Sequence, residues 1–283
     1  MSEPAQSSDA AVLDSLERIL IVGRRELRTM FRARWALILA LVFVMVVVGI
    51  TVIGDGYERG YVPTIFDLMT PLELIVPLFA IALSYRAILG DATSGELDIL
   101  RSYPLRPFEQ VLGVFLGRSL FVATAVTIAL VLSGMAVAVT PPETVRVFAT
   151  HEVADSPLFF ARLVVLTVGF AIVLVSIGLA ISAMVTSTRT AFAIIGALLL
   201  ILFVGFEFAI LQGLETGLIP EDLLAPLLGI GPLSAFRGLI LETAVAIDPG
   251  ADAAPASSLI SAVALVAWLI VGLTLATVSL RRR

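Results

Sequence analysis

The sequence predicts an all-α integral membrane protein with six transmembrane helices. Of its 283 residues, 59% are hydrophobic and 14% are charged, and the mean hydropathy is +1.06. This composition is too apolar for a soluble globular domain of ordinary usage. Six apolar runs are long enough to cross a bilayer, and polar or charged segments separate them. We expect the spans at 36–53, 68–89, 111–139, 158–185, 191–211 and 259–280.

The chain begins with small and polar residues. Residues 1–14 show neither the basic start nor the cleavage pattern of a signal peptide, so we expect a disordered cytosolic tail. Asp14 and Glu17 have the spacing of a capping box, which predicts a helix from Ser15 to Arg34. Apolar residues recur in this helix at steps of three and four, and six arginines accompany them. Such a helix is typical of a membrane interface; the alternative is a solvated face on a cytosolic helix.

The first two spans differ in regularity. The first, 36–53, makes a helix of about 27 Å, which crosses the hydrocarbon core with help from the flanking Trp35. The second, 68–89, contains Pro71 and Pro77. Neighbouring helices can satisfy the carbonyl groups that a proline frees, so we expect a kinked helix here rather than a break.

The next three spans are long and rich in small residues. The third, 111–139, is longer than a bilayer requires, so we expect its first turns to project into the cytosol. A short turn joins the fourth and fifth spans, 158–185 and 191–211. Small residues four positions apart, such as Gly178 and Ser182, favour close packing of helices in lipid.

The segment before the last span, 213–257, is acidic and irregular. It contains two apolar pieces, 223–230 and 236–245, which are too short to cross a bilayer. We therefore expect short re-entrant or interfacial helices on the external side. The sixth span, 259–280, ends in three arginines.

The distribution of arginine predicts the orientation in the cell membrane. Thirteen arginines fall before the first span, in the loops after the second and fourth spans, or at the C-terminal end, and four fall on the opposite face. By the positive-inside rule, both termini lie in the cytosol. An even number of spans agrees with this orientation.

The longest charged passage between two spans, 86–118, has a regular order. Gly90 and Asp91 favour the end of one helix. A short amphipathic piece follows, and Pro104 closes it. Pro107 then has the position preferred at the start of the next helix. We expect a short surface helix between two long ones.

This passage resembles the loop between the second and third spans of ABC transporter permeases of the type-2 exporter class. An acidic residue precedes a Gly-Glu-Leu segment, a Ser-x-Pro follows, and the next helix opens with Leu-Gly-x-x-Leu-Gly. The matching residues are Asp91, Gly95, Glu96, Leu97, Leu100, Ser102, Pro104, Leu112, Gly113, Leu116 and Gly117. In that family the loop carries a cytosolic coupling helix that docks on the ATPase subunit. The resemblance assigns this docking to Gly95, Glu96, Leu97, Leu100, Arg101 and Pro104.

The resemblance extends to the whole six-span layout, with 15–283 as a single permease domain. The chain is similar to permeases of drug export systems and of multicopper enzyme maturation. The resemblance implies a membrane-spanning permease subunit that forms an export path and couples to a separate ABC ATPase subunit, where ATP and Mg²⁺ bind. The implied partners are that ATPase, a second permease in a homodimer or paired arrangement, and lipid; no nucleic acid is expected.

Catalytic chemistry finds little support in the sequence. The chain has eighteen arginines but no lysine, so a phosphate-binding loop of the Walker type cannot form, and it has no cysteine. His151 lacks the second histidine of a zinc helix, and Ser176 lacks the preceding glycine of a nucleophile elbow. One histidine, no cysteine and six scattered methionines suggest no copper pathway. An intramembrane enzyme and a secondary transporter are the alternatives; the latter should show an internal repeat.

Two carboxylates, Glu73 and Glu207, fall inside the spans, and Arg118 is a further intramembrane charge. Glu73 and Glu207 both lie at shallow depth near the outer face, if each residue adds about 1.5 Å of helix. They either reach external water or the polar groups of 213–257, or they take part in an outer gate. Arg118 lies close to the inner end of its helix, so we expect it to extend to the cytosolic interface.

Overall fold

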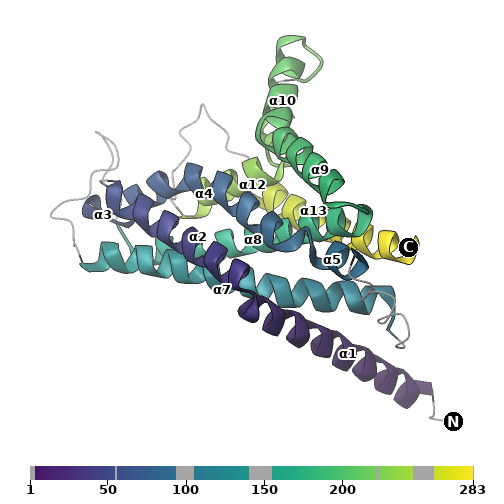
Figure 1. Cartoon of the computed structure of the whole chain (residues 1–283). Coiled ribbons are helices and arrows are strands. Elements are labelled where there is room, and N and C mark those ends of the chain that lie inside the picture. Colours follow the sequence, from purple (N-terminus) through teal and green to yellow (C-terminus); the bar gives the residue numbers. More distant parts are fainter. Residues whose placement is uncertain are drawn as a thin grey trace.

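The computed structural model describes residues 4–54, 56–93, 105–139, 155–220, 223–244 and 258–282. Within these ranges the regular structure is helical, and no strand occurs (Figure 1). Six stretches are long and apolar enough to cross a membrane: Arg34–Ile53, Tyr61–Ala92, Pro107–Val139, Pro157–Met184, Thr188–Glu215 and Ser258–Arg282. The prediction of an all-α integral membrane protein with six spans is confirmed.

The spans are built from helices that are in places interrupted. The described helices are α1 (Pro4–Arg32), α2 (Arg34–Ile53), α3 (Gly56–Arg59), α4 (Tyr61–Ser84), α5 (Ala87–Thr93), α7 (Pro107–Val139), α8 (Pro157–Met184), α9 (Thr188–Leu200), α10 (Phe206–Glu215), α11 (Leu224–Leu228), α12 (Pro232–Leu239) and α13 (Ser258–Arg282). Two π-helical segments, η1 (Ile201–Gly205) and η3 (Ile240–Ala244), follow α9 and α12. Figure 1 shows α5, the start of α7 and the end of α13 at the same end of the bundle.

Helix α8 is the centre of the bundle. It packs against α4, α7 and α13, and its Phe170 and Leu174 are fully buried. Small residues let its neighbours approach. A Cβ atom added at Gly272 of α13 would lie 2.6 Å from the hydroxyl oxygen of Ser176, and one added at Gly178 would lie 2.7 Å from the Cβ of Ser84. The expected close packing at Gly178 therefore occurs against α4.

Ser182 of α8 stabilises an interruption in the second span. Helix α4 continues through Pro71 and Pro77 and ends at Ser84; α5 begins at Ala87, after a turn. The Ser182 hydroxyl accepts hydrogen bonds from the backbone N–H groups of Ile88 (2.9 Å) and Leu89 (3.0 Å). A side chain thus replaces the backbone acceptors that the interruption removes, as an apolar environment requires.

At the other end of α4, a carboxylate from a distant part of the chain caps the helix. Asp155, just before α8, accepts hydrogen bonds from the backbone N–H groups of Tyr61 (2.9 Å) and Val62 (3.0 Å). These donors have no partner within the helix, since they belong to its first turn. Asp155 and Ser182 therefore join α4–α5 to α8 at both ends of the bundle.

Helix α1 begins earlier than the sequence suggested. We predicted a disordered tail over 1–14 and a helix from Ser15, whereas the structure is helical from Pro4. Asp14 therefore lies inside the helix and does not cap it. The residues before it include several alanines, which have the highest helix propensity and extend the helix toward the N-terminus.

Helix α1 packs lengthwise on the first part of α7 and runs in the same direction (Figure 1). Successive contacts join Arg18 to Glu109, Val22 to Gly113, Gly23 to Gly117 and Phe31 to Phe121. Helix α2 continues beside the second part of α7, where the Thr51 hydroxyl donates to the Ser133 hydroxyl over 2.9 Å. The first turns of α7 thus lie beside α1, which precedes the first span. The expected projection of these turns into the cytosol stays a prediction.

Candidate functional site

The residues assigned to ATPase docking lie outside the described residues. These are Gly95, Glu96, Leu97, Leu100, Arg101 and Pro104. The structure describes the two ends of their loop, namely α5 up to Thr93 and the chain from Leu105 onward. Ser182 fastens the first of these ends through Ile88 and Leu89.

Glu109 fastens the second end of the loop and joins it to α1. Its side chain is fully buried. One carboxylate oxygen accepts a hydrogen bond from the backbone N–H of Arg106 (2.9 Å) and from Nε of Arg18 (3.1 Å). The other accepts from the Ser15 hydroxyl (2.6 Å) and from Nη2 of Arg18 (2.9 Å). Glu109 therefore caps its own helix and forms a charge-assisted contact between helices.

A second ion pair between α1 and α7 lies deeper in the bundle. Nη2 of Arg118 is 2.6 Å from Oε1 of Glu26, and the two side chains are only 7% and 10% exposed. Nη1 of Arg118 also donates to the backbone carbonyl of Leu83 near the end of α4. This pair links α1, α4 and α7.

The expected position of Arg118 is therefore wrong. We predicted that its side chain would extend to the cytosolic interface, whereas it is buried, 6% exposed, between helices. Glu26 and the Leu83 carbonyl supply acceptors inside the bundle, so the guanidinium does not need to reach water. Glu26 is 92 positions away in the sequence and was not identified as a partner.

Two glycines of the Leu-Gly-x-x-Leu-Gly segment, Gly113 and Gly117, let α1 and α7 approach closely enough to form both ion pairs. A Cβ atom added at Gly113 would lie 2.5 Å from the Cβ of Val22, and one added at Gly117 would lie 2.6 Å from the backbone oxygen of Gly23. Neither distance is possible for a real side chain without movement of α1. These glycines therefore allow the close contact between α1 and α7.

Arg237 of α12 brings the two intramembrane carboxylates together at the other end of the bundle. Its Nε and Nη2 atoms bind Oε1 and Oε2 of Glu73 on α4, over 2.7 and 2.5 Å. Its Nη1 atom lies 3.4 Å from Oε1 of Glu207 on α10. The contact to Glu73 is bidentate and the contact to Glu207 is single and longer. The sequence indicated the polar groups of 213–257 as one alternative for these carboxylates but did not single out Arg237, the one arginine in that segment.

Local structure fixes Arg237 over α4. Pro232 occupies the first turn of α12, and Phe236 is fully buried, with its ring stacked 4.4 Å from that of Phe170 on α8. This packing directs the side chain of the next residue, Arg237, toward α4. The hydrogen bond to Glu73 raises the pKa of Arg237, so the guanidinium stays charged.

The span that carries Glu207 has few contacts within the chain. In the most apolar part of Thr188–Glu215, 11% of the residues are buried, against 67% in Tyr61–Ala92. The π-helical segment η1 directly precedes α10, and such segments often occur at functional sites. The Glu207 side chain is 45% exposed, while Glu73 is 5% exposed. Glu207 is thus the accessible member of the cluster.

Among the described residues, no group of three or more His, Asp or Glu side chains is placed to hold a metal ion. His151 lies outside the described residues. Ser176 donates its hydroxyl hydrogen to the backbone oxygen of Val173 over 2.6 Å, and its side chain lies against Gly272 of α13. Its observed role is in helix packing.

A family profile described as ABC-2 family transporter protein matches residues 20–283. The chain belongs to this family. It is 28% identical to the probable ABC transporter permease protein NosY of Stutzerimonas stutzeri over 285 aligned residues. The alignment covers 95% of this chain and 99% of that protein. The chain is 29% identical over 274 residues to the protein of the same name from Pseudomonas aeruginosa, which covers 93% and 97%.

As a member of the ABC-2 family, the chain is a multi-pass membrane permease subunit of an ABC transporter. The family assignment favours a transport subunit over an intramembrane enzyme or a secondary transporter. The profile begins within α1, after Ser15 and Arg18, and so includes Glu26, Arg118, the residues around Arg237 and both ends of the loop 94–104.

We expect Glu26→Gln to lower the free energy of unfolding by about 3 kcal/mol, because it leaves the Arg118 charge buried without a partner. The double variant Glu26→Leu, Arg118→Met should lose much less unfolding free energy than the sum of the losses of Glu26→Leu alone and Arg118→Met alone. Thermal unfolding in detergent measures the stability of each variant, and Glu17→Gln on the exposed face of α1 is the control. Additive losses would contradict a coupled pair.

Proposed function

We propose that the chain forms the export path of an ABC transporter together with a second permease, and that its loop 94–104 docks on a separate ATPase subunit. The observation that carries this proposal is the anchoring of both loop ends, by Ser182 and by Glu109. A flexible loop with loose ends would absorb a displacement, whereas an anchored loop passes it to the helices. The number of spans and the arginine asymmetry support a cytosolic location of this loop and of both termini.

The two ion pairs define which helices such a displacement would reach. Glu109 and Arg118 join α7 to α1 at positions nine residues, or about 14 Å, apart. Two separated contacts prevent rotation of one helix about the other. Arg118 also contacts Leu83, so α4 follows the same movement. The proposed moving unit therefore consists of α1, α7 and α4.

This unit leads to the cluster at the opposite end, because α4 also carries Glu73. Glu73 holds Arg237 through two short hydrogen bonds, and Arg237 holds Glu207 through one long contact. When α4 moves relative to α10, the long contact is the first to break. We assign to Glu73, Arg237 and Glu207 the role of an outer gate, in which Glu207 is released while Glu73 and Arg237 remain together.

The exposed side of α9 and α10 supports a permease pair. A half-exposed carboxylate on a spanning helix is costly against lipid and is typical of a helix that faces a polar path. Few residues of this span are buried by its own chain. A second permease opposite α9 and α10 would enclose a path between the two chains, with Glu207 on its wall.

Docking can be tested by co-purification with the ABC ATPase subunit of the same transporter. Deletion of residues 96–101, or the pair Leu97→Asp and Leu100→Asp, should abolish co-purification without preventing membrane insertion, because apolar anchors are lost. Ser94→Asp adds a charge to the same loop at a polar position and is the matched control. The chain alone should hydrolyse no ATP. Normal association of the deletion variant would place the docking site elsewhere.

The outer gate can be tested without knowing the substrate. In the cysteine-free chain, Ile210→Cys introduces a thiol one turn beyond Glu207, at a position that is 8% exposed. Glu207→Gln should increase its labelling by an impermeant thiol reagent several-fold, because the weaker contact to Arg237 opens more often. ATP hydrolysis should stay near normal.

Glu215→Gln is the matched control, since this residue also lies on α10 but does not contact Arg237. It should leave the labelling rate of Ile210→Cys unchanged. Equal labelling in the Glu207→Gln and Glu215→Gln backgrounds would remove Glu207 from the gate.

A further inference from the structure

We propose that a groove between α1 and α7 binds one anionic phospholipid, with an acyl chain against its leucines and the headgroup phosphate at Arg24. The groove has a volume of about 220 Å³. Its lining residues are Leu20, Gly23, Arg24, Leu27, Leu116, Gly117 and Leu120. This inference requires only that the chain lies in a membrane, so it stands whether or not the loop docks on an ATPase.

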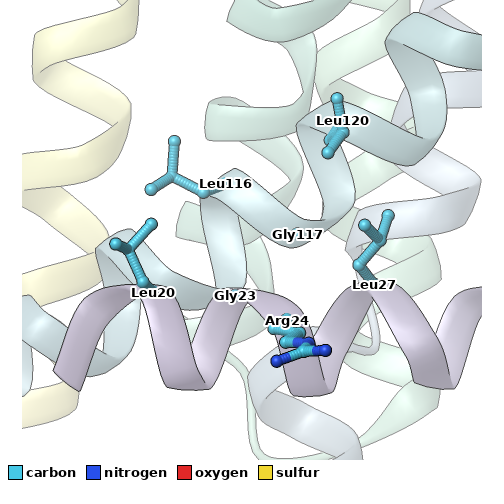
Figure 2. A pocket seen from close by; sticks show the side chains of 7 residues that line it. All are labelled: Leu20, Gly23, Arg24, Leu27, Leu116, Gly117 and Leu120. Carbon is cyan, nitrogen blue, oxygen red and sulfur yellow. The ribbon is translucent and has the colours of Figure 1, made fainter. Parts of the chain in front are cut away.

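The groove follows from the glycines at the helix contact. Figure 2 shows Gly23 and Gly117 between the four leucines, two of which come from each helix. Because the glycines lack side chains, backbone forms the floor, and the leucines form the walls. Leu20 is 64% exposed and Leu120 is 55% exposed. Walls of this kind are costly to leave in water and suit a hydrocarbon chain.

Arg24 is the one charged side chain that lines this groove. It is exposed and lies on the α1 side, between Gly23 and Leu27 (Figure 2). Within the described part of the chain it makes no side-chain hydrogen bond or ion pair. The other arginines of this contact are engaged, because Arg18 binds Glu109 and Arg118 binds Glu26. Arg24 therefore offers a guanidinium next to an apolar groove.

Charge complementarity selects the ligand. A guanidinium binds phosphate oxygens through paired hydrogen bonds, and a basic amphipathic helix attracts anionic lipids. Arg28 and Arg32, further along α1, are also exposed and add to the positive potential. A molecule with an acyl chain and a phosphate headgroup of net negative charge satisfies both the groove and Arg24. In the proposed orientation it comes from the cytosolic leaflet.

A second groove in the structure provides a comparison. It has a volume of about 280 Å³ and is lined by Leu158, Ala161, Arg162, Val165, Leu166 and Thr243. Its arginine is already engaged, because Nη1 of Arg162 donates to the backbone oxygen of Thr243 over 2.7 Å and the guanidinium lies 5.5 Å from the centre of the Phe159 ring. This groove should therefore show a weaker preference for anionic lipids than the groove at Arg24.

Native mass spectrometry of the full-length protein can test the proposal. The protein is purified in detergent with equal amounts of dioleoyl phosphatidylglycerol and dioleoyl phosphatidylcholine. The unmodified chain should retain phosphatidylglycerol in preference to phosphatidylcholine. Arg24→Gln should reduce this preference about fivefold. Arg32→Gln removes the same charge two turns away from the groove and should reduce the preference much less than Arg24→Gln does.

A variant that fills the groove tests the acyl chain separately. Leu116→Trp should lower the retention of both lipids, and glycerol phosphate, which has the headgroup chemistry without the chains, should not displace phosphatidylglycerol. Elution as a single species on gel filtration verifies that each variant is folded. The proposal is overturned if Arg24→Gln and Arg32→Gln have the same effect, if Leu116→Trp retains both lipids fully, or if glycerol phosphate competes.

Discussion

A buried arginine in a membrane protein needs acceptors for its charged hydrogen-bond donors, and Arg118 finds them on two other helices. Its pairing with Glu26 and with the Leu83 carbonyl requires that α1 and α4 both lie against α7. Gly113 and Gly117 make that approach possible. The position of α1 and the register of α7 depend on this one requirement.

The two charged clusters have different strengths, and the difference suits different roles. Between α1 and α7, Glu109 and Glu26 are buried and each makes short contacts to an arginine. At the opposite end, Arg237 holds one carboxylate firmly and the other weakly. A rigid contact transmits displacement, while a contact with one weak side can open. In the proposed mechanism, α4 connects the two because it contacts both clusters.

The spans could be predicted from the sequence because each is a long apolar run, and the shared depth of Glu73 and Glu207 followed from the rise per residue of a helix. The partners of the buried charged residues could not be predicted from the sequence. Glu26 and Arg118 are 92 positions apart, and nothing in a local pattern shows that α1 packs along α7. The start of α1 was predicted too late because the capping box at Asp14 was given more weight than the alanines before it.

In the proposed mechanism, α1 and α7 move as one unit, while the contact of Arg237 with Glu207 opens and α4 separates from α10. Electron spin resonance distances in the cysteine-free chain measure both, with labelled protein diluted into unlabelled protein so that each distance lies within one chain. Labels at Ile21→Cys and Ile128→Cys report on α1 and α7, and labels at Leu74→Cys and Phe208→Cys report on α4 and α10. On ATP binding to the assembled transporter, the first distance should stay constant and the second should lengthen. A change in the first distance, or none in the second, would contradict the account.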